Sequence, residues 1–209
     1  MNRTWRLVKD AVLLELAVWR CLGRWIARRP EAPPGAVQLG YSRLTAPVMW
    51  LWIFGAFAEV VAFELVLRSI DATWAHVVRI PLFVVGVWGA FWMLGMAGSF
   101  YVRRHLVLAD RLVVRNGPRF RVEVPLSAVV GVRGAEHEFE GMVRTVHEED
   151  GLLLVGPGNR TNVELTLAGP TVLATHDRDR VADRVGLWVD EPREVVRLLA
   201  ERTRSADVR

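Results

Sequence analysis

Residues 48–67 read VMWLWIFGAFAEVVAFELVL, an almost unbroken apolar stretch that nevertheless contains two glutamates, Glu59 and Glu64. An α-helix rises about 1.5 Å per residue, so a helix over this stretch is long enough for the bilayer hydrocarbon core of about 30 Å. A second apolar stretch, residues 80–100, has no charged side chain. The two stretches therefore predict a transmembrane helical hairpin over residues 47–101.

The segment between the two stretches, RSIDATWAHVVR at residues 68–79, is too polar for a bilayer core and predicts the hairpin loop. Pro47 and Pro81 lie at the beginnings of the two stretches, and the first turn of a helix accepts proline because its N–H groups have no helical partner. We therefore expect each proline in a first turn.

Basic residues near the ends of spans favour the cytoplasmic side of a membrane. They gather before the first span and after the second, whereas the predicted loop has only Arg68 and Arg79, with Asp71 between them. The flanking basic residues are Arg28, Arg29, Arg43, Arg103, Arg104 and Arg111. The sequence thus predicts a multi-pass protein of the plasma (inner) membrane with both termini in the cytoplasm.

The distribution of charge also bears on nucleic-acid binding. The chain has 209 residues, 52% of them hydrophobic, and a net charge of +4. Residues 1–46 carry eight basic and three acidic groups, whereas residues 102–209 carry 17 of each. A nucleic-acid-binding protein concentrates positive charge on its folded domain. Because the excess flanks the hairpin instead, we expect no nucleic-acid partner.

Residues 1–29 predict an amphipathic helix that lies in the membrane interface. One face is basic and the opposite face is apolar and rich in tryptophan, the pattern of a helix held on anionic lipid. The predicted interface residues are Trp5, Arg6, Lys9, Trp19, Arg20, Arg24, Trp25 and Arg28. The alternative is that this helix packs on protein, and Glu15, in the middle of the apolar face, is not explained by the lipid interpretation. Residues 30–46, which contain EAPPGAVQLG, predict a stiff linker.

The second span contains several small residues, among them Gly86, Gly89, Gly95 and Gly98. Small residues let two helix backbones approach closely in a membrane. They predict packing against the first span of the same chain or, alternatively, a face that makes a homo-oligomer. The only cysteine, Cys21, cannot form an internal disulfide, and we expect it to be packed.

Residues 102–209 alternate apolar and polar residues with period two, which predicts short β-strands. HLVLADRLVVRNG predicts two strands around a turn, FRVEVPL and SAVVGVRG one strand each, and LLLV, NVELTLAG, TVLAT and DRVGLWVD the rest. EPREVVRLLAERTR predicts a terminal helix that begins at Pro192. We expect an α+β membrane protein in which about seven strands form a sandwich or barrel capped by the terminal helix.

These residues also carry a family resemblance. Two spans followed by HLVLADRLVVRNG, VEVPLSAVVGVR and WVDEPREVVRLL resemble the bacterial pleckstrin-homology-like domain of small membrane proteins. The resemblance covers roughly residues 100–203 and implies a bent sandwich of seven strands with one capping helix. It implies binding rather than catalysis. The loop at Ala109-Asp110-Arg111 is too short to hold a phosphoinositide headgroup, so we do not expect the lipid site known in other pleckstrin domains.

No catalytic, nucleotide-binding, metal or cofactor motif stands out. His137 and His147 share an acidic segment, but their spacing matches no common metal site, and we assign no metal, cofactor or enzyme activity. Membrane lipid and an unidentified protein or peptide are the expected partners of a membrane-anchored binding module. The alternative is an oligomeric ion- or proton-conducting subunit that uses Glu59, because a carboxylate in the middle of a span needs a partner or a proton. For Glu64 we expect an ion pair with Arg68, one helical turn later.

Overall fold

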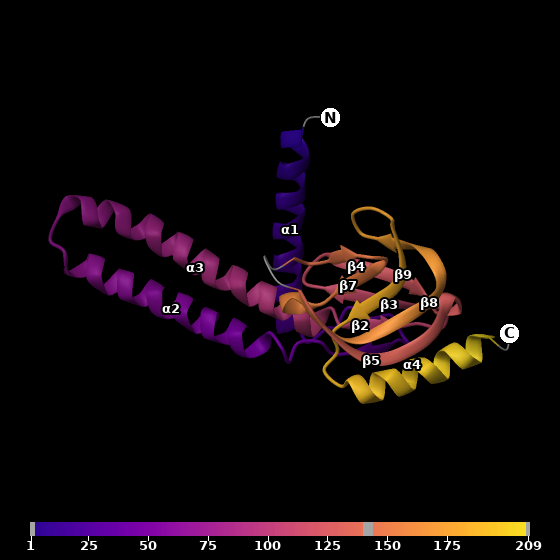
Figure 1. The fold of residues 1–209 in the computed structure, drawn as a ribbon. Helices are drawn as coiled ribbons and strands as arrows, with labels where there is room; N and C mark the ends of the chain where they lie inside the picture. Colours follow the sequence, from indigo (N-terminus) through magenta and orange to yellow (C-terminus); the bar gives the residue numbers. More distant parts are fainter. Residues whose placement is uncertain (1–2, 140–143, 208–209) are drawn as a thin grey trace.

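The computed structural model describes residues 3–139 and 144–207. These ranges contain four α-helices and nine β-strands (Figure 1). The helices are α1 (Arg3–Ile26), α2 (Ala46–Ser69), α3 (Thr73–Val102) and α4 (Pro192–Asp207). The strands are β1 (Val37–Leu39), β2 (His105–Val107), β3 (Arg111–Asn116), β4 (Phe120–Pro125), β5 (Val129–Glu138), β6 (His147–Glu149), β7 (Leu152–Val155), β8 (Arg160–Thr175) and β9 (Arg180–Leu187). Two 3-10 turns, η1 (Leu126–Ala128) and η2 (Pro157–Asn159), join strands.

The helices α2 and α3 form the expected antiparallel hairpin, and they project together from the β-domain (Figure 1). The predicted twelve-residue loop is wrong, because the two helices continue into it and leave only residues 70–72 between them. Pro47 lies in the first turn of α2 as expected. Pro81 lies inside α3, because the helix begins eight residues earlier, at Thr73. The predicted boundaries of the second stretch were therefore too narrow at its beginning.

The helix α1 crosses α3 near the end of α3 that adjoins the β-domain, and its N-terminal half projects away from the hairpin axis (Figure 1). Gly95 and Gly98 of α3 make the crossing possible. A Cβ atom at Gly95 would lie 2.6 Å from Cγ1 and 2.8 Å from the carbonyl oxygen of Val18, and one at Gly98 would lie 3.2 Å from Cβ of Trp25. Gly86 instead faces Val60 of α2. The small residues of α3 thus serve contacts with two different helices of the same chain.

The strands form one mixed sheet with the order β1-β2-β3-β4-β8-β9-β7-β6, and β5 pairs with β8 off this path. Among the described strands all pairings are antiparallel except that of β7 with β9, which is parallel. The expected count of about seven strands was too low. The linker contributes β1, which pairs with β2, and the acidic segment contributes β6, which pairs with β7. The segments NVELTLAG and TVLAT, expected as two strands, belong to the single long strand β8.

The core of the β-domain consists of the inward-facing residues of its strands and of one face of α4. In β4 the predicted alternation is confirmed, with Phe120, Val122 and Val124 buried. The register of β5 shifts between Val129 and Gly131, an irregularity of the β-bulge type. The helix α4 begins at Pro192 as expected and packs on β5 and η1 through Val195 and Leu199. The part of the chain described here is thus an α+β protein with a projecting helical hairpin.

Candidate membrane interface

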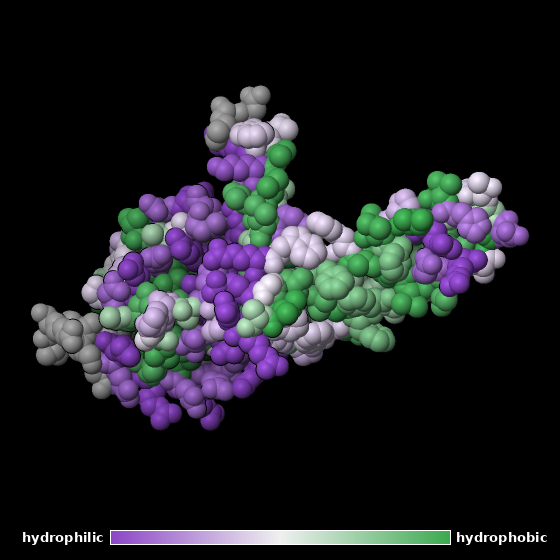
Figure 2. Space-filling model, turned by 180° about the vertical axis from the view of Figure 1, so that it is seen from behind, coloured by the Kyte–Doolittle hydropathy of each residue, from purple (hydrophilic) through white to green (hydrophobic). Residues whose placement is uncertain are grey.

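The outer surface of the α2–α3 hairpin is apolar. Both helices are long and apolar enough to cross a membrane, and only 11% and 6% of their most apolar windows are buried within the chain. Large apolar side chains therefore face outward along the hairpin, among them Leu51, Trp52, Phe54, Val77 and Val85. Figure 2 shows this apolar surface along the hairpin and a largely hydrophilic surface over the β-domain. The hairpin is not a core helix pair of the β-domain.

The N-terminal half of α1 has an exposed apolar stripe. Trp5, Val8, Val12 and Leu16 recur every three or four residues, which places them on one face of the helix, and all four are exposed. In Figure 2 the apolar surface of α1 lies on the side of the hairpin, and hydrophilic residues lie on the side of the β-domain. The apolar surfaces of α1 and of the hairpin thus lie on the same side of the molecule.

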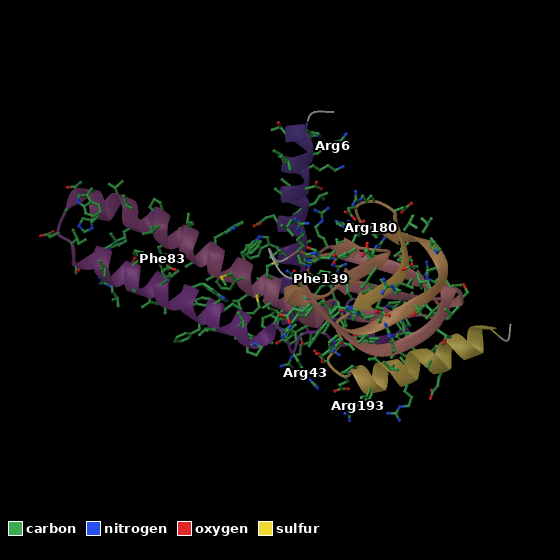
Figure 3. The ribbon with its side chains drawn as sticks, in the orientation of Figure 1. Arg6, Arg43, Phe83, Phe139, Arg180 and Arg193 are labelled. Atoms are coloured by element: carbon green, nitrogen blue, oxygen red, sulfur yellow. The ribbon has the colours of Figure 1, made fainter. Side chains whose placement is uncertain are left out.

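The predicted interface residues of α1 fall into two groups. Trp5, Arg6 and Lys9 are exposed on the projecting half, where Figure 3 labels Arg6. Trp19 and Trp25 instead contact the hairpin: the ring centroid of Trp19 lies 4.9 Å from that of Trp88, and the ring of Trp25 lies 6.0 Å from that of Trp50. Trp25 also stacks on Tyr101, with ring centroids 6.1 Å apart.

The three arginines of the predicted set lie toward the end of α1. Arg20 and Arg28 are exposed, and Arg24 is partly buried and donates a hydrogen bond from Nη2 to the carbonyl oxygen of Pro30, 3.0 Å away. Helix α1 therefore has two parts with different surroundings. Its C-terminal half packs on protein, and its N-terminal half presents an apolar face outside the fold.

Glu15 is explained by the packing of α1 on α3. Its carboxylate accepts hydrogen bonds from the indole N–H of Trp19, at 2.7 Å, and from that of Trp92, at 2.8 Å. Two buried indole N–H groups need acceptors, and a carboxylate provides one oxygen for each. Helical periodicity alone does not show this arrangement, because Trp92 belongs to another helix.

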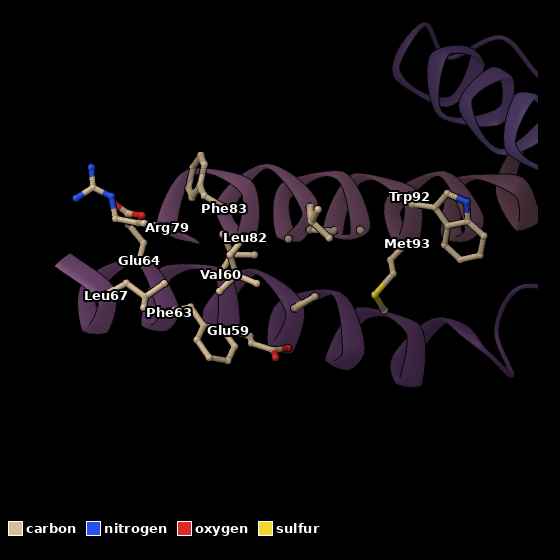
Figure 4. A pocket seen from close by; sticks show the side chains of 15 residues that line it. Glu59, Val60, Phe63, Glu64, Leu67, Arg79, Leu82, Phe83, Trp92 and Met93 are labelled. Carbon is tan, nitrogen blue, oxygen red and sulfur yellow. The ribbon is translucent and has the colours of Figure 1, made fainter. Parts of the chain in front are cut away.

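The groove between α2 and α3 contains both glutamates of the first apolar stretch (Figure 4). It has a volume of about 380 Å³ and is otherwise lined mostly by apolar side chains. The predicted Glu64–Arg68 pair is wrong: Oε1 of Glu64 lies 3.6 Å from Nε of Arg79, across the hairpin. The helices extend farther than expected, which brings Arg79 into α3 beside Glu64. Glu59 is exposed and has neither a hydrogen bond nor an ion pair with any residue that the structure describes.

A basic pocket lies where the end of α1 meets the end of α3. It has a volume of about 710 Å³. Its lining includes Arg24, Arg28, Arg29 and Arg104 with the aromatic rings of Trp25 and Tyr101. In the sequence Arg28, Arg29 and Arg104 indicated the cytoplasmic side of the hairpin, and Arg24 and Arg28 belonged to the basic face of the predicted interfacial helix. Their convergence could not be predicted, because Arg104 lies about eighty positions from the others.

A second groove, of about 490 Å³, lies between β1 and the first two turns of α4. Val37, Val195 and Leu198 supply apolar surface, and the charged residues at its edges are Arg43, Arg104, Asp190, Glu191 and Glu194. Figure 3 shows Arg43 and Arg193 near the beginning of α4. The groove combines an apolar floor with charges of both signs.

Hydrogen bonds of Asp190 stabilise one wall of this second groove. The carboxylate of Asp190 accepts hydrogen bonds from the backbone N–H groups of Ser42, at 3.2 Å, and Arg43, at 2.9 Å. The backbone N–H of Asp190 donates to the carbonyl oxygen of Gly40, 2.8 Å away. The segment expected as a stiff linker is thus bound to the beginning of α4.

Buried polar residues join the helices to the β-domain. His105 lies under the ring of Tyr41, with ring centroids 4.4 Å apart. Its Nδ1 accepts a hydrogen bond from the N–H of Arg115, at 2.9 Å, so its Nε2 carries the proton and donates to the carbonyl oxygen of Trp188, also at 2.9 Å. Burial lowers the pKa of His105 to about 4. This histidine is therefore neutral at physiological pH.

Two arginines surround this histidine contact. Arg103 donates to the carbonyl oxygen of Gly117, and Arg115 donates to that of Glu31 at 2.7 Å. Oε1 of Glu31 lies 3.6 Å from Nε of Arg103. Sequence reasoning missed Glu31, Tyr41 and His105 as partners, because nothing in their spacing indicates that the linker folds back on the β-domain.

Two further polar clusters of the described β-domain contain Glu164 and the histidines of the acidic segment. The buried carboxylate of Glu164 accepts hydrogen bonds from Arg133 and from His137, whose Nε2 is 2.8 Å away. Although burial alone would raise the pKa of Glu164, these partners lower it. His147 contacts Oδ1 of Asn159 instead, so the two histidines of the acidic segment have different partners. Among residues 3–139 and 144–207, no three His, Cys, Asp or Glu side chains are grouped to hold a metal ion.

The chain matches no family model, no curated protein and no solved structure.

Proposed function

We propose that this protein is a membrane-anchored binding module whose β-domain recruits a protein or peptide at the cytoplasmic face of the plasma membrane. The observation that carries the proposal is that the apolar surfaces of the α2–α3 hairpin and of α1 lie on the same side of the molecule. The exposed apolar residues of α1 include Trp5, Val8, Val12 and Leu16. A hairpin inserted in a bilayer brings that stripe to the interface, where an amphipathic helix is stable.

The charge pattern supports the orientation. The basic pocket and Arg43 lie at the end of the hairpin that adjoins the β-domain, and basic residues favour the cytoplasmic side. The far end of the hairpin has Arg68 and Arg79 only, and Arg79 is paired with Glu64. In this placement the hairpin spans the membrane twice and both termini are cytoplasmic.

The groove between β1 and α4 is the proposed site of the partner. Its apolar floor fits apolar side chains of a peptide, and its edge charges can order the flanking positions of that peptide. A binding role is also what the resemblance to the pleckstrin-homology-like domain implies. The observation specific to this chain is that the groove is open next to the proposed membrane surface.

Site-specific crosslinking tests the proposal. A photoreactive amino acid at Leu198, in the groove, should capture a defined protein in native membranes, and the same group at Val181, exposed on β9 and outside the groove, should not. Extraction at alkaline pH and a reporter fused after residue 209 test the membrane placement independently. Release of the chain into the alkaline supernatant, or an extracellular reporter, would contradict the anchoring.

A second candidate function rests on Glu59. Its carboxylate is exposed on the hairpin and has no partner among the described residues, although a charge at the middle of a span costs about 2.5–3.5 kcal/mol. An oligomer in which several copies bring Glu59 to a common axis would be an ion- or proton-conducting subunit. Proton flux into liposomes that is lost in Glu59→Gln would favour this function, and capture at Leu198 that persists in Glu59→Gln would favour the binding module.

A further inference from the structure

The four arginines of the basic pocket have no acidic partner. Arg24, Arg28 and Arg29 come from the end of α1 and the turn that follows it, and Arg104 follows α3. No carboxylate lines the pocket, and none of the four forms an ion pair with another described residue. The neighbouring Arg103, by contrast, is paired with Glu31.

The arginines of the basic pocket make few contacts that stabilise the fold. Arg24 makes one structural contact, its hydrogen bond to Pro30, and its Nε is buried without an acceptor. Arg28 and Arg29 are exposed on the turn, and Arg104 is exposed on the opposite wall. Several guanidinium groups around one cavity suit an anion with several acceptor oxygens, and phosphate is such an anion.

The backbone at Arg28 provides an independent observation. Arg28 has a φ of 53°, and the N–H groups of Arg28 and Arg29 bond to the carbonyl oxygens of Trp25 and Arg24. This is the Schellman ending of a helix, in which the residue with positive φ is usually glycine. An arginine at this position is strained, and strain of this kind is often retained where the side chain has a role in binding.

The surroundings of the pocket favour an amphiphile over a free anion. Ile26 on its rim is 70% exposed, and Trp25 lies between Tyr101 and Trp50, which is itself exposed on the hairpin. The arginines are thus continuous with the apolar surface that we assign to the membrane. A phospholipid can place its phosphate among the arginines and its acyl chains along Ile26 and Trp50.

We propose that the basic pocket binds the phosphate of an anionic phospholipid from the inner leaflet. The inference rests on the proposed membrane placement and deepens it by naming the ligand of one site. The shared chemistry is a phosphate group, which a soluble phosphate would also supply. Basic pockets beside membrane helices on the cytoplasmic side are suited to anionic headgroups, and each basic residue near the surface strengthens the attraction.

Lipid binding by the full-length protein in neutral detergent tests the inference. Short-chain phosphatidylglycerol, short-chain phosphatidylcholine and inorganic phosphate are titrated in parallel, and the bound species are counted by native mass spectrometry. The test variant is Arg28→Gln/Arg29→Gln/Arg104→Gln, which leaves Arg24 and its hydrogen bond intact. The control is Arg193→Gln/Arg197→Gln/Arg202→Gln, which removes the same charge from exposed positions on α4.

The wild type and the control should retain phosphatidylglycerol in preference to phosphatidylcholine. The affinity of the test variant for phosphatidylglycerol should fall on the order of a hundredfold, because three favourable charges are lost. Equal retention of both lipids, an equal loss in the control variant, or saturation of the site by inorganic phosphate at the concentrations effective for phosphatidylglycerol would overturn the inference.

Alkaline extraction and the maleimide reactivity of Cys21, which is buried, are measured on the same variants. A test variant that stays membrane-bound with Cys21 protected, yet binds phosphatidylglycerol like the wild type, overturns the lipid site alone. Release of the wild type from membranes at alkaline pH overturns the membrane placement itself, and the lipid site with it.

Discussion

Arg28 shows at the scale of a single residue how a binding role and local stability can oppose each other. Its φ of 53° is a conformation that glycine adopts freely and other residues adopt at a cost of roughly 1 kcal/mol. Glycine would also remove one of four charges from the basic pocket.

We therefore expect Arg28→Gly to stabilise the fold by about 1 kcal/mol while weakening the binding of phosphatidylglycerol. Thermal unfolding in neutral detergent and the lipid titration measure the two effects. Arg28→Gln should keep the strain and lose the charge, so its melting temperature should stay near that of the wild type. A lower melting temperature for the glycine variant would contradict the assigned helix ending.

His105 links the stability of the protein to pH. Burial lowers its pKa to about 4 from the usual 6.5, so the folded state binds a proton less readily than the unfolded state. The contribution of neutral His105 to the stability of the fold is fully present above pH 6.5 and is lost as the pH falls toward 4. A shift of this size corresponds to about 3 kcal/mol.

The prediction is that His105→Gln flattens the decrease in melting temperature between pH 7 and pH 4. The exposed His76 provides the control, since His76→Gln also removes one imidazole but from a position without described partners. A wild-type pH profile in His105→Gln would show that another group is responsible. The absolute stability of His105→Gln should be lower at pH 7, because its contacts with Arg115 and Trp188 change.

Predictions for single residues were correct where local backbone geometry determines the position of a residue. They were wrong where contacts with another element determine its partner. Pro47 and Pro192 were placed correctly, because a first helical turn accepts proline whatever surrounds it. The pairing of Glu64 was wrong, since Arg79 on the adjacent helix replaces the partner expected one turn away. Glu15 could not be explained from its own helix, because one of its two indole partners belongs to α3.

At the scale of elements, the crossing of α1 and α3 depends on Gly95. Any side chain there would overlap Val18, including its carbonyl oxygen 2.8 Å from the position of a Cβ atom. Cys21, three residues after Val18 on α1, is buried, and burial raises the pKa of its thiol. The only cysteine of the chain thus reports whether α1 is packed.

We expect Gly95→Leu to displace α1 and to increase the rate of maleimide labelling of Cys21 at least about tenfold, since thiolate formation and access both rise. Gly89→Leu is a matched control on the same helix, because nothing lies within 4 Å of a Cβ atom there. Equal labelling rates in the two variants would contradict the role of the close approach at Gly95.

The sequence indicated the long elements better than the short ones. Residues 48–67 and 80–100 identify their helices by length and composition alone, although α3 begins earlier than expected. The strands β1 and β6 have three residues each, too few for a recognisable alternation, and they exist because β2 and β7 offer them hydrogen bonds. Pairing of this kind is decided by the tertiary fold.

At the scale of the whole molecule, Asp190 connects the beginning of α4 to the segment that leads into the hairpin. Its two carboxylate oxygens accept from the N–H groups of Ser42 and Arg43. These bonds fix the β-domain relative to the hairpin and shape the groove between β1 and α4. The orientation of the β-domain therefore depends on a contact between residues about 150 positions apart.

Asp190→Ala should leave both N–H groups without their acceptor and destabilise this connection by roughly 1–3 kcal/mol. The expected result is faster proteolytic cleavage within residues 36–45 of the full-length protein. Asp179→Ala, at an exposed position with no described hydrogen bond, is the control. Cleavage of Asp190→Ala at the wild-type rate would mean that the buried contacts of Tyr41 and His105 are sufficient to hold the domain.

Composition and periodicity were sufficient to predict an α+β fold with a helical hairpin and a terminal helix. They were not sufficient to predict the pockets. The groove beside α4 and the basic pocket both include Arg104, which meets residues from the linker and from the end of α1. Such sites arise from segments remote in sequence, and a single sequence contains no signal for their proximity.

The crossing of α1 and α3 at Gly95 fixes the length of the hairpin that is available to span the membrane. From Thr73 to Gly95, α3 measures about 33 Å at 1.5 Å per residue, close to the hydrophobic thickness of an ordinary bilayer. Because α1 is attached at one end of this distance, the protein should match only a narrow range of lipid chain lengths. In thinner bilayers the hairpin must tilt, and a tilt lifts the free end of α1 from the surface. Quenching of Trp5 fluorescence by brominated lipids, in a variant whose other tryptophans are phenylalanine, should therefore decrease as the acyl chains are shortened.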